Sequence, residues 1–264
     1  MKMTKKIFIS GKIIAKTGLH IGGSSLGLSI GNTENTVVRN PITNQPYVPG
    51  SSIRGKMRSL LERLEGKFTI MEGSDIKNGP LTDKPDDIIC KVFGIPAKEP
   101  KNEKEETKEE KSQPPTRLIV RDGNLVNVEE LEKAQETDMP FTEVKTEVVI
   151  DRITSAAMPR QLERVPAGAI FDLDMVLNVW EDDPEKEMID LLFKGLILMQ
   201  NDYLGGHGGR GSGQVEIADE SLAEKTIEEY NSNAAPRERN DIAIPLELQN
   251  GELSQPSEAG HASN

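Results

Sequence analysis

Hydrophobic positions along the chain follow two different periods, and these periods set the expected elements. Residues 7–16 mix β-branched and polar side chains, and in residues 142–150 and 171–179 apolar and polar side chains alternate. Alternation of this kind is typical of strands that bury one face. We therefore expect strands over these three segments. Two shorter strands are expected at residues 117–122 and 214–217.

Two longer segments carry apolar side chains at a helical spacing, in residues 53–64 and 188–199. A Pro-Gly-Ser-Ser sequence precedes the first stripe, and Ser51 or Ser52 can cap the first N–H groups of that helix. Before the second stripe, Pro184 suits the first position of a helix, where its missing N–H is not needed. Two short helices are also expected, at residues 86–94 and 129–135.

The order of these elements bears on the fold and on the domain boundaries. Strands and helices alternate irregularly, which predicts an α+β fold with antiparallel hairpins; a ferredoxin-like sheet covered by helices is its simplest form. We expect one domain over residues 1–218, with a long hairpin excursion around residues 142–165. Residues 97–115 and 219–264 are too polar to fill a core. We expect a flexible charged insertion in the first and a disordered acidic tail in the second.

The most distinctive local sequence is a glycine-rich run over residues 203–213, which contains six glycines together with His207 and Arg210. Glycine lets the backbone approach a ligand closely, and successive N–H groups can then cradle a phosphate. A flexible linker is the alternative, but apolar periodic segments flank the run closely. The run lacks the Gly-Lys-Ser/Thr of a phosphate-binding nucleotide loop, and it follows a helix rather than a strand. It therefore indicates a phosphate backbone as the ligand.

Charge is distributed unevenly over a chain whose formal net charge is −12. Residues 1–67 carry eleven Lys and Arg against three acids, whereas residues 216–264 carry eleven acids against three cations. The local potential, not the total, steers a polyanion, so an acidic chain with a basic part can bind nucleic acid. Arg54, Lys56 and Arg58 fall in the first two turns of an expected helix, an end that already attracts anions. An ordinary solvated helix face is the alternative.

Several classes of protein are disfavoured by composition. The single cysteine, Cys90, excludes a disulfide framework and a cysteine zinc site. The three histidines have no metal-ligand spacing, and no nucleophile elbow is present. No apolar run approaches the roughly 20 residues that span a bilayer, and no signal peptide is apparent, so we expect a soluble cytoplasmic protein. Few aromatic residues are available for base stacking, which favours backbone clamping of a nucleic acid.

One acid stands apart from the others. Glu34 is the only acid between residues 1 and 61, in an expected loop between the basic strand and the basic helix. A carboxylate near bound RNA can hold a divalent metal or assist attack of a 2′-hydroxyl on the adjacent phosphate. A loop carboxylate without a role is the alternative.

Five motifs occur in a fixed order along the chain. They are Thr-Gly-Leu-His-Ile-Gly-Gly, Pro-Gly-Ser-Ser-Ile-Arg-Gly-Lys-Met-Arg, Asp-Arg-Ile-Thr, Pro-Arg-Gln-Leu-Glu-Arg and the glycine-rich run. In this order they resemble the repeated backbone subunit of the type III-A CRISPR effector, the Csm complex, which belongs to the RAMP superfamily. The resemblance covers residues 5–218 apart from the insertion at residues 97–115.

The resemblance implies a fold, a set of partners and an activity. Members have an RRM-like (ferredoxin-like) core and stack into a filament along a guide crRNA, together with other subunits of this antiviral complex. A thumb hairpin, here around residues 142–165, wedges into the guide–target duplex. The family is a metal-dependent endoribonuclease that cuts target RNA at regular intervals, with Mg²⁺ as the expected metal. By the match, the RNA-binding residues are His20, Gly22, Gly23, Ser51, Ser52, Arg54, Lys56, Arg58, Arg152, Arg160, Arg164, Gly206, Gly208, Gly209 and Arg210.

The sequence departs from the family at the catalytic position. The family has Asp in the loop before the Pro-Gly-Ser-Ser motif, whereas this chain has Glu34, and no Asp occurs between residues 1 and 74. Glu34 is thus the expected catalytic and metal-binding residue, with a carboxylate displaced by about one ångström, which can cost on the order of 10²-fold in rate. Slowed cleavage is expected. The alternatives are the same scaffold without nuclease activity, and a stand-alone guide-processing nuclease with His20 as general base.

Overall fold

The computed structural model describes residues 2–23, 36–67, 84, 86–95, 115–134, 137 and 139–249. Glu34, almost all of the predicted insertion and the last fifteen residues lie outside this part of the chain. The strands are β1 (Met3–Ala15), β2 (Tyr47–Val48), β3 (Leu118–Val120), β4 (Gly123–Asn124), β5 (Glu143–Ile150), β6 (Ala157–Arg164), β7 (Ile170–Trp180), β8 (Val215–Thr226) and β9 (Arg237–Glu238). The helices are α1 (Gly50–Leu64), α2 (Ile88–Phe93), α3 (Val128–Glu132), α4 (Glu185–Asn201), the 3₁₀ turn η1 (Gly208–Arg210), α5 (Ile227–Asn231) and α6 (Leu246–Gln249).

The central sheet has five strands in the order β3-β7-β1-β8-β9, and all neighbouring pairs are antiparallel. Helix α1 lies between β1 and β3 in the sequence, and α4 lies between β7 and β8. Strands and helices in this order, with β1 between β7 and β8, form the β-α-β-β-α-β arrangement of a ferredoxin-like fold. The predicted α+β class with a ferredoxin-like core is confirmed.

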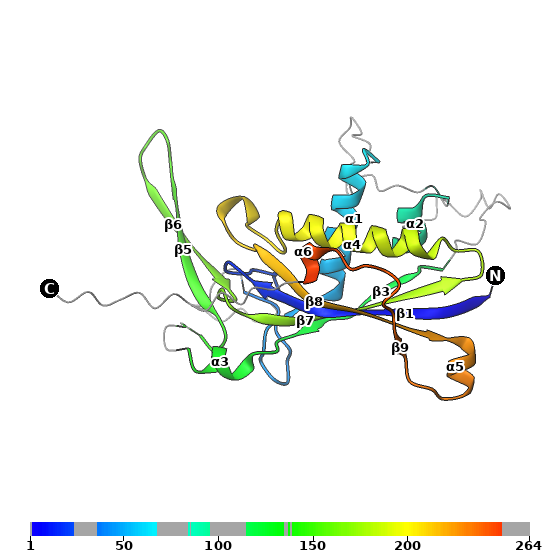
Figure 1. Cartoon of the computed structure of the whole chain (residues 1–264). Helices are drawn as coiled ribbons and strands as arrows, with labels where there is room; N and C mark the ends of the chain where they lie inside the picture. The colour runs from blue at the N-terminus through cyan, green and yellow to red at the C-terminus, as the bar shows by residue number, and fades with distance from the viewer. Residues whose placement is uncertain are drawn as a thin grey trace, which may run out of the picture.

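The helices are not shared equally between the two faces of the sheet. Figure 1 shows α1, α2 and α4 above the sheet and α5 below it, while the β5–β6 hairpin projects at the end opposite the N-terminus. Between the sheet and the upper helices, alternate residues of β1 and β7 meet the apolar stripes of α1 and α4. Gly195 of α4 allows the two helices to approach, since a Cβ there would lie 3.0 Å from Cε of Met57. Burial of each large apolar side chain in this layer contributes roughly 1.5–3 kcal/mol.

Helix α1 begins differently from the expectation. Neither Ser51 nor Ser52 caps it. Instead the N–H of Gly50 donates to Oδ1 of Asp122 at 2.8 Å, from the turn between β3 and β4. A Cβ at Gly50 would lie only 2.3 Å from the carbonyl oxygen of Val120, so the helix start is pressed against that turn. Because a carboxylate from another segment occupies the capping position, the two serines have no capping role.

The predicted disordered tail is wrong for residues 219–249. Strand β8 continues past the predicted boundary, and α5, β9 and α6 follow it. Arg239 pairs with Glu185 at 2.8 Å and Glu224 at 2.7 Å, and Leu248 is fully buried. Few apolar side chains are needed here because ion pairs and a strand pairing attach the segment to the sheet. Among the described residues, no helix is long and apolar enough to cross a lipid bilayer.

Candidate nucleic-acid interface

The glycine-rich run packs directly on the turn that contains His20. The N–H of Gly206 donates to the carbonyl oxygen of His20 at 2.8 Å, and the N–H of Gly213 donates to Gly18 at 3.0 Å. Gly205 has a φ of +77°, and a Cβ there would lie 2.3 Å from the carbonyl oxygen of His20. Two segments almost 190 residues apart in the sequence therefore form one continuous surface, and glycine is required at their contact.

Within this run the backbone forms a small concave turn. His207 is left-handed at a φ of +62°, and η1 follows it. The N–H of Arg210 donates back to the carbonyl oxygen of His207 at 2.9 Å. Among the described residues, no acceptor faces the N–H groups of His207, Gly208 and Gly209. A left-handed residue followed by right-handed ones is the geometry of an anion-binding nest, so three donors are available to one phosphate.

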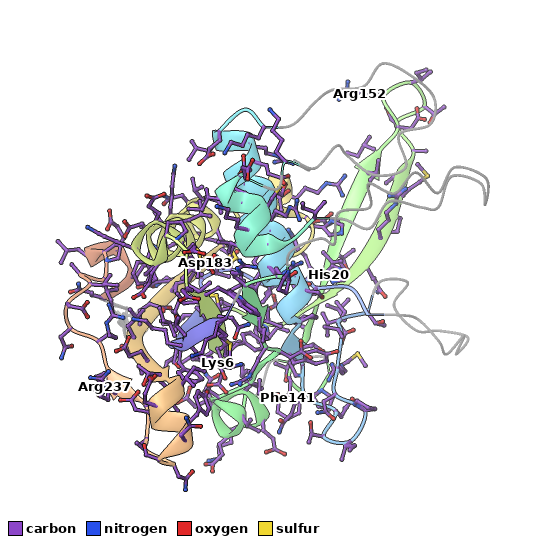
Figure 2. The ribbon with its side chains drawn as sticks, turned by 90° about the vertical axis from the view of Figure 1, so that its right-hand side faces the viewer. Lys6, His20, Phe141, Arg152, Asp183 and Arg237 are labelled. Carbon is purple, nitrogen blue, oxygen red and sulfur yellow. The ribbon has the colours of Figure 1, made fainter. Side chains whose placement is uncertain are left out.

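His20 has one ring nitrogen committed to the protein. Nδ1 lies 2.7 Å from the carbonyl oxygen of Glu163, so it must carry the proton in that bond. Nε2 is then the acceptor of the neutral ring. The ring stands edge-on to His207 at 5.5 Å between centroids. His20 is buried but lies between the hairpin and α1 in Figure 2. It can exchange one hydrogen bond with a ligand through Nε2.

Gly22 and Gly23 follow His20 and form a short pairing with the segment that contains Thr36 and Val37. The N–H of Gly23 donates to the carbonyl oxygen of Thr36 at 3.0 Å, and Gly22 forms a bridge with Val37. A Cβ at Gly23 would lie 3.1 Å from the carbonyl oxygen of Val37, which is tighter than ordinary contact. These two glycines thus belong to the same surface as the His20 turn.

All three cations predicted on α1 have protein partners that the sequence did not indicate, and those of Arg54 and Arg58 lie at the end of α2. Arg54 donates to the carbonyl oxygen of Phe93, and Nη1 of Arg58 donates to that of Gly94 at 2.9 Å. Arg58 is buried and also pairs with Glu62 at 2.8 Å. Burial, and next the charge of Arg58, lower the pKa of Arg54. Both guanidinium groups therefore attach α1 to the carbonyl end of α2, where a helix accumulates partial negative charge.

Lys56, the third cation, points toward the glycine-rich run. Its Nζ lies 2.8 Å from a carboxylate oxygen of Asp202 and 3.5 Å from the ring centroid of Tyr203. A Cβ at Gly208 would lie 2.1 Å from that same Tyr203 ring, so the run is packed against the aromatic face. Tyr203 thus joins the start of α1 to the anion-binding nest.

The predicted hairpin excursion is present as β5 and β6, paired from Glu143 with Arg164 to Ile150 with Ala157. Figure 2 shows Arg152 at its tip, remote from His20. At the base, Arg164 lies over Gly18, where a Cβ would meet its Nε at 2.3 Å. The predicted residues are therefore spread: Arg164 joins the His20 surface, whereas Arg152 and the exposed Arg160 extend along the hairpin.

Strand β5 of the hairpin also contacts the glycine-rich run, through Arg210. Nη1 of Arg210 lies 3.1 Å from Oε2 of Glu147, and Nζ of Lys145 donates to the carbonyl oxygen of Arg210 at 3.2 Å. The Arg210 side chain remains 56% exposed. Burial opposes ionisation of Glu147, but the two cations outweigh it and lower its pKa. Arg210 can therefore still reach a phosphate from this position.

Glu163 is a residue of this region to which the sequence assigned no role. Its carboxylate is 1% exposed and accepts hydrogen bonds from Arg39 at 2.7 Å, Thr142 at 2.7 Å and the N–H of Val37 at 2.9 Å. Burial would raise its pKa, but these donors outweigh burial and lower it. The only signal in the sequence was a lone acid within the fourth motif, since Arg39 stands 124 residues away.

Comparison with known proteins places this architecture in a family. The chain has a ferredoxin-like sheet, a projecting hairpin and a glycine-rich turn, and the family model for the RAMP superfamily matches residues 12–216. "CRISPR system Cms endoribonuclease Csm3" of Methanothermobacter thermautotrophicus is 36% identical over 92% of this chain and 96% of that protein. The protein of the same name from Streptococcus thermophilus is 37% identical over 84% of this chain and 90% of that protein.

Solved structures agree with this result. A Csm3–Csm4 subcomplex of the type III-A CRISPR-Cas interference complex contains a chain that is 27% identical, with a TM-score of 0.55 and 90% of both chains covered. The Csm3 crystal structure from Methanopyrus kandleri is 21% identical with a TM-score of 0.57, over 88% of this chain and 80% of that one, and supports the fold alone. The chain belongs to the RAMP superfamily and, within it, to the Csm3 family.

Proposed function

We propose that this chain is the guide-RNA-binding backbone subunit of a type III CRISPR effector and that it cleaves complementary target RNA. One observation carries the proposal: the anion-binding nest, the His20 turn and the base of the hairpin form one surface. The names of its relatives as Csm3 endoribonucleases support the activity. The Csm3–Csm4 subcomplex supports partner subunits. In this proposal the partners are guide crRNA, target RNA, further copies of the chain in a filament and other subunits of the complex.

In the proposed guide site, a backbone phosphate occupies the nest formed by the N–H groups of His207, Gly208 and Gly209. Arg210 adds a charge-assisted contact, and His20 accepts one hydrogen bond through Nε2. The proposed RNA contacts along α1 and the hairpin are Ser51, Ser52, Lys56, Arg152, Arg160 and Arg164. Gly22, Gly23 and Gly206 allow the close backbone approach. Arg54 and Arg58 act indirectly in this proposal, by holding α1 against α2.

The proposed cleaving group is Glu34, which lies outside the described residues. It precedes Thr36 by two positions in the sequence, and Thr36 is paired with the His20 turn through Gly23. Among the described residues, no group of three His, Cys, Asp or Glu side chains could hold a metal ion. In our proposal a divalent metal, Mg²⁺, would take Glu34 and RNA phosphate oxygens as ligands and stabilise charge on the phosphate.

Cleavage of a complementary target RNA by the assembled complex with Mg²⁺ tests this proposal. Wild type is compared with Glu34→Ala and Glu34→Asp. Products at regular intervals that vanish in the Ala variant and rise in the Asp variant would support Glu34 as a slightly displaced catalytic acid. Cleavage that persists in the Ala variant would locate the catalytic group elsewhere. Activity that appears only in the Asp variant would leave a binding scaffold without nuclease function.

A further inference from the structure

His20 is a buried side chain with one ring nitrogen that the protein leaves unused. Nδ1 donates to the carbonyl oxygen of Glu163 at 2.7 Å, which fixes the proton of the neutral ring on that nitrogen. Among the described residues, no group bonds Nε2, and Nε2 is not one of the fully buried polar atoms that lack a partner. Nε2 therefore still reaches solvent as a hydrogen-bond acceptor, although the residue is only 7% exposed.

Two glycines from different segments border this edge of the ring. A Cβ at Gly22 would lie 3.7 Å from Nε2, and a Cβ at Gly206 would lie 3.4 Å from the neighbouring Cδ2. A larger residue at either position would place side-chain atoms beside the acceptor. Because both positions are glycine, a ligand can approach Nε2 as closely as the backbone of the two segments allows.

The acceptor lies next to the anion-binding nest. The rings of His20 and His207 meet edge-on with their centroids 5.5 Å apart, and the N–H of His207 is the first of the nest donors. The carbonyl oxygen of His20 also accepts from the N–H of Gly206 at 2.8 Å. In a ribonucleotide the 2′-hydroxyl and the 3′-phosphate are carried by neighbouring carbons of one sugar. A phosphate in the nest would therefore bring a 2′-hydroxyl close to the His20 ring.

An acceptor at this place is informative because a nucleic-acid backbone has few donors. Phosphodiester oxygens and sugar ring oxygens only accept hydrogen bonds, so they cannot bond an unprotonated imidazole nitrogen. The 2′-hydroxyl of ribose can donate, and deoxyribose lacks it. The N–H groups of the bases are the other donors of a strand, but in the proposed function the guide needs them for pairing with its target.

We propose that His20 is a specificity-determining residue: its Nε2 accepts a hydrogen bond from a ribose 2′-hydroxyl of the guide strand and so selects RNA over a strand that lacks this donor. This inference rests on the proposed function, in which the guide backbone occupies the nest. The nest and Arg210 bind the phosphate of either kind of strand, whereas Nε2 distinguishes the sugar. The carbonyl of Glu163 acts indirectly, by keeping the proton of the ring on Nδ1.

Binding of the full chain to two short single strands of the same sequence tests this inference, without divalent metal so that neither strand is cut. One strand is RNA, and the other carries 2′-fluorine on every ribose, which keeps the sugar shape of RNA but cannot donate. We expect wild type to bind the fluorinated strand about fivefold more weakly, the scale of one hydrogen bond. His20→Asn should bind both strands with nearly equal affinity, because the Asn amide can replace Nδ1 toward Glu163 but has no atom in the place of Nε2.

A second variant reaches the acceptor without changing the histidine. Gly22→Val leaves the bond between His20 and Glu163 in place but adds methyl groups beside Nε2, so it should also remove the preference for RNA. This variant carries the test if His20→Asn does not fold. Arg210→Ala is the matched control, because it removes a phosphate contact from the same surface. It should weaken binding of both strands by the same factor and leave the ratio of the two affinities at the wild-type value.

Three outcomes would contradict the inference. Equal affinity of wild type for the two strands would overturn it and would indicate that a protonated His20 ring donates to a phosphate instead. A wild-type ratio retained in the folded His20→Asn or Gly22→Val variant would assign the sugar contact to another residue. If wild type binds neither strand, the proposed RNA surface itself fails, and this inference with it.

Discussion

Arg39 and Glu163 form an ion pair of 2.7 Å at the base of the hairpin, with the Glu163 carboxylate almost entirely removed from solvent. Removing two charges from water is costly, and a buried pair is repaid only by further hydrogen bonds. Thr142 and the N–H of Val37 provide them. The pair therefore contributes less to stability than to geometry. It fixes the orientation of the hairpin relative to the segment that contains Val37 and Arg39.

Removal of one partner of this pair should strongly destabilise the protein. We expect Glu163→Ala to lower the free energy of unfolding by about 3 kcal/mol, because Arg39 loses its buried counter-charge. Urea unfolding measures this. The exposed pair of Glu129 and Lys133 is the control, and Glu129→Ala should change stability by less than about 0.5 kcal/mol. Equal effects of the two variants would mean that burial of Glu163 has no energetic consequence.

Because the pKa of Glu163 is lowered by its donors, its contribution to stability is present above the unfolded pKa near 4.5. It is lost as the pH falls through the lower folded value. Wild type should therefore lose stability on acidification by more than Glu163→Ala does. A parallel pH dependence of the two proteins would contradict the assigned network.

Arg210 and Arg58 should behave differently toward RNA. Arg210→Ala removes an exposed cation beside the nest, so we expect weaker RNA binding and a salt-dependence slope smaller by about one. Arg58→Ala removes a buried guanidinium bonded to Gly94 and Glu62, so we expect a loss of about 2 kcal/mol in stability and an unchanged slope. Affinity at several salt concentrations, with unfolding in parallel, separates the two. A smaller salt-dependence slope in Arg58→Ala would instead mean that Arg58 contacts a phosphate.

Local periodicity was sufficient for the main elements. The alternation in β7 and the apolar stripe of α1 each depend on neighbours within a few residues, so both were predicted from the sequence. The hairpin was predicted in the same way, from its alternating first strand and polar second strand. Motif resemblance then predicted that the His20 turn and the glycine-rich run share a role, and their hydrogen bonds now show direct contact.

Pairing across long distances in the sequence was not predictable. Arg54 looked like a phosphate ligand because its partner, the carbonyl of Phe93, is a backbone group with no sequence signature. The segment after residue 218 looked disordered because its stability comes from Arg239 and Leu248 contacting distant elements. In each case the deciding interaction is formed only after the sheet has assembled.

Glu220 provides a prediction in which stability falls with rising pH. A bulge between β1 and β8 lies at Gly11, where a Cβ would meet Oε1 of Glu220 at 2.4 Å. Neither carboxylate oxygen of Glu220 has a hydrogen-bond partner among the described residues. Burial raises the pKa of Glu220 to about 8. Between the unfolded pKa of 4.5 and that value, the folded state binds more protons than the unfolded state, so stability declines as the pH rises.

Glu220→Gln replaces this carboxyl with a neutral group of the same shape and should remove the decline. We expect the variant to exceed wild type by about 1–3 kcal/mol at pH 8 and by much less at pH 5. Urea unfolding at the two pH values measures the difference, with Glu238→Gln, an exposed position on β9, as the control. If the free energy of unfolding changes equally for wild type and Glu220→Gln between pH 5 and 8, the Glu220 carboxyl is already ionised in the folded protein. Burial beside Gly11 would then not raise its pKa.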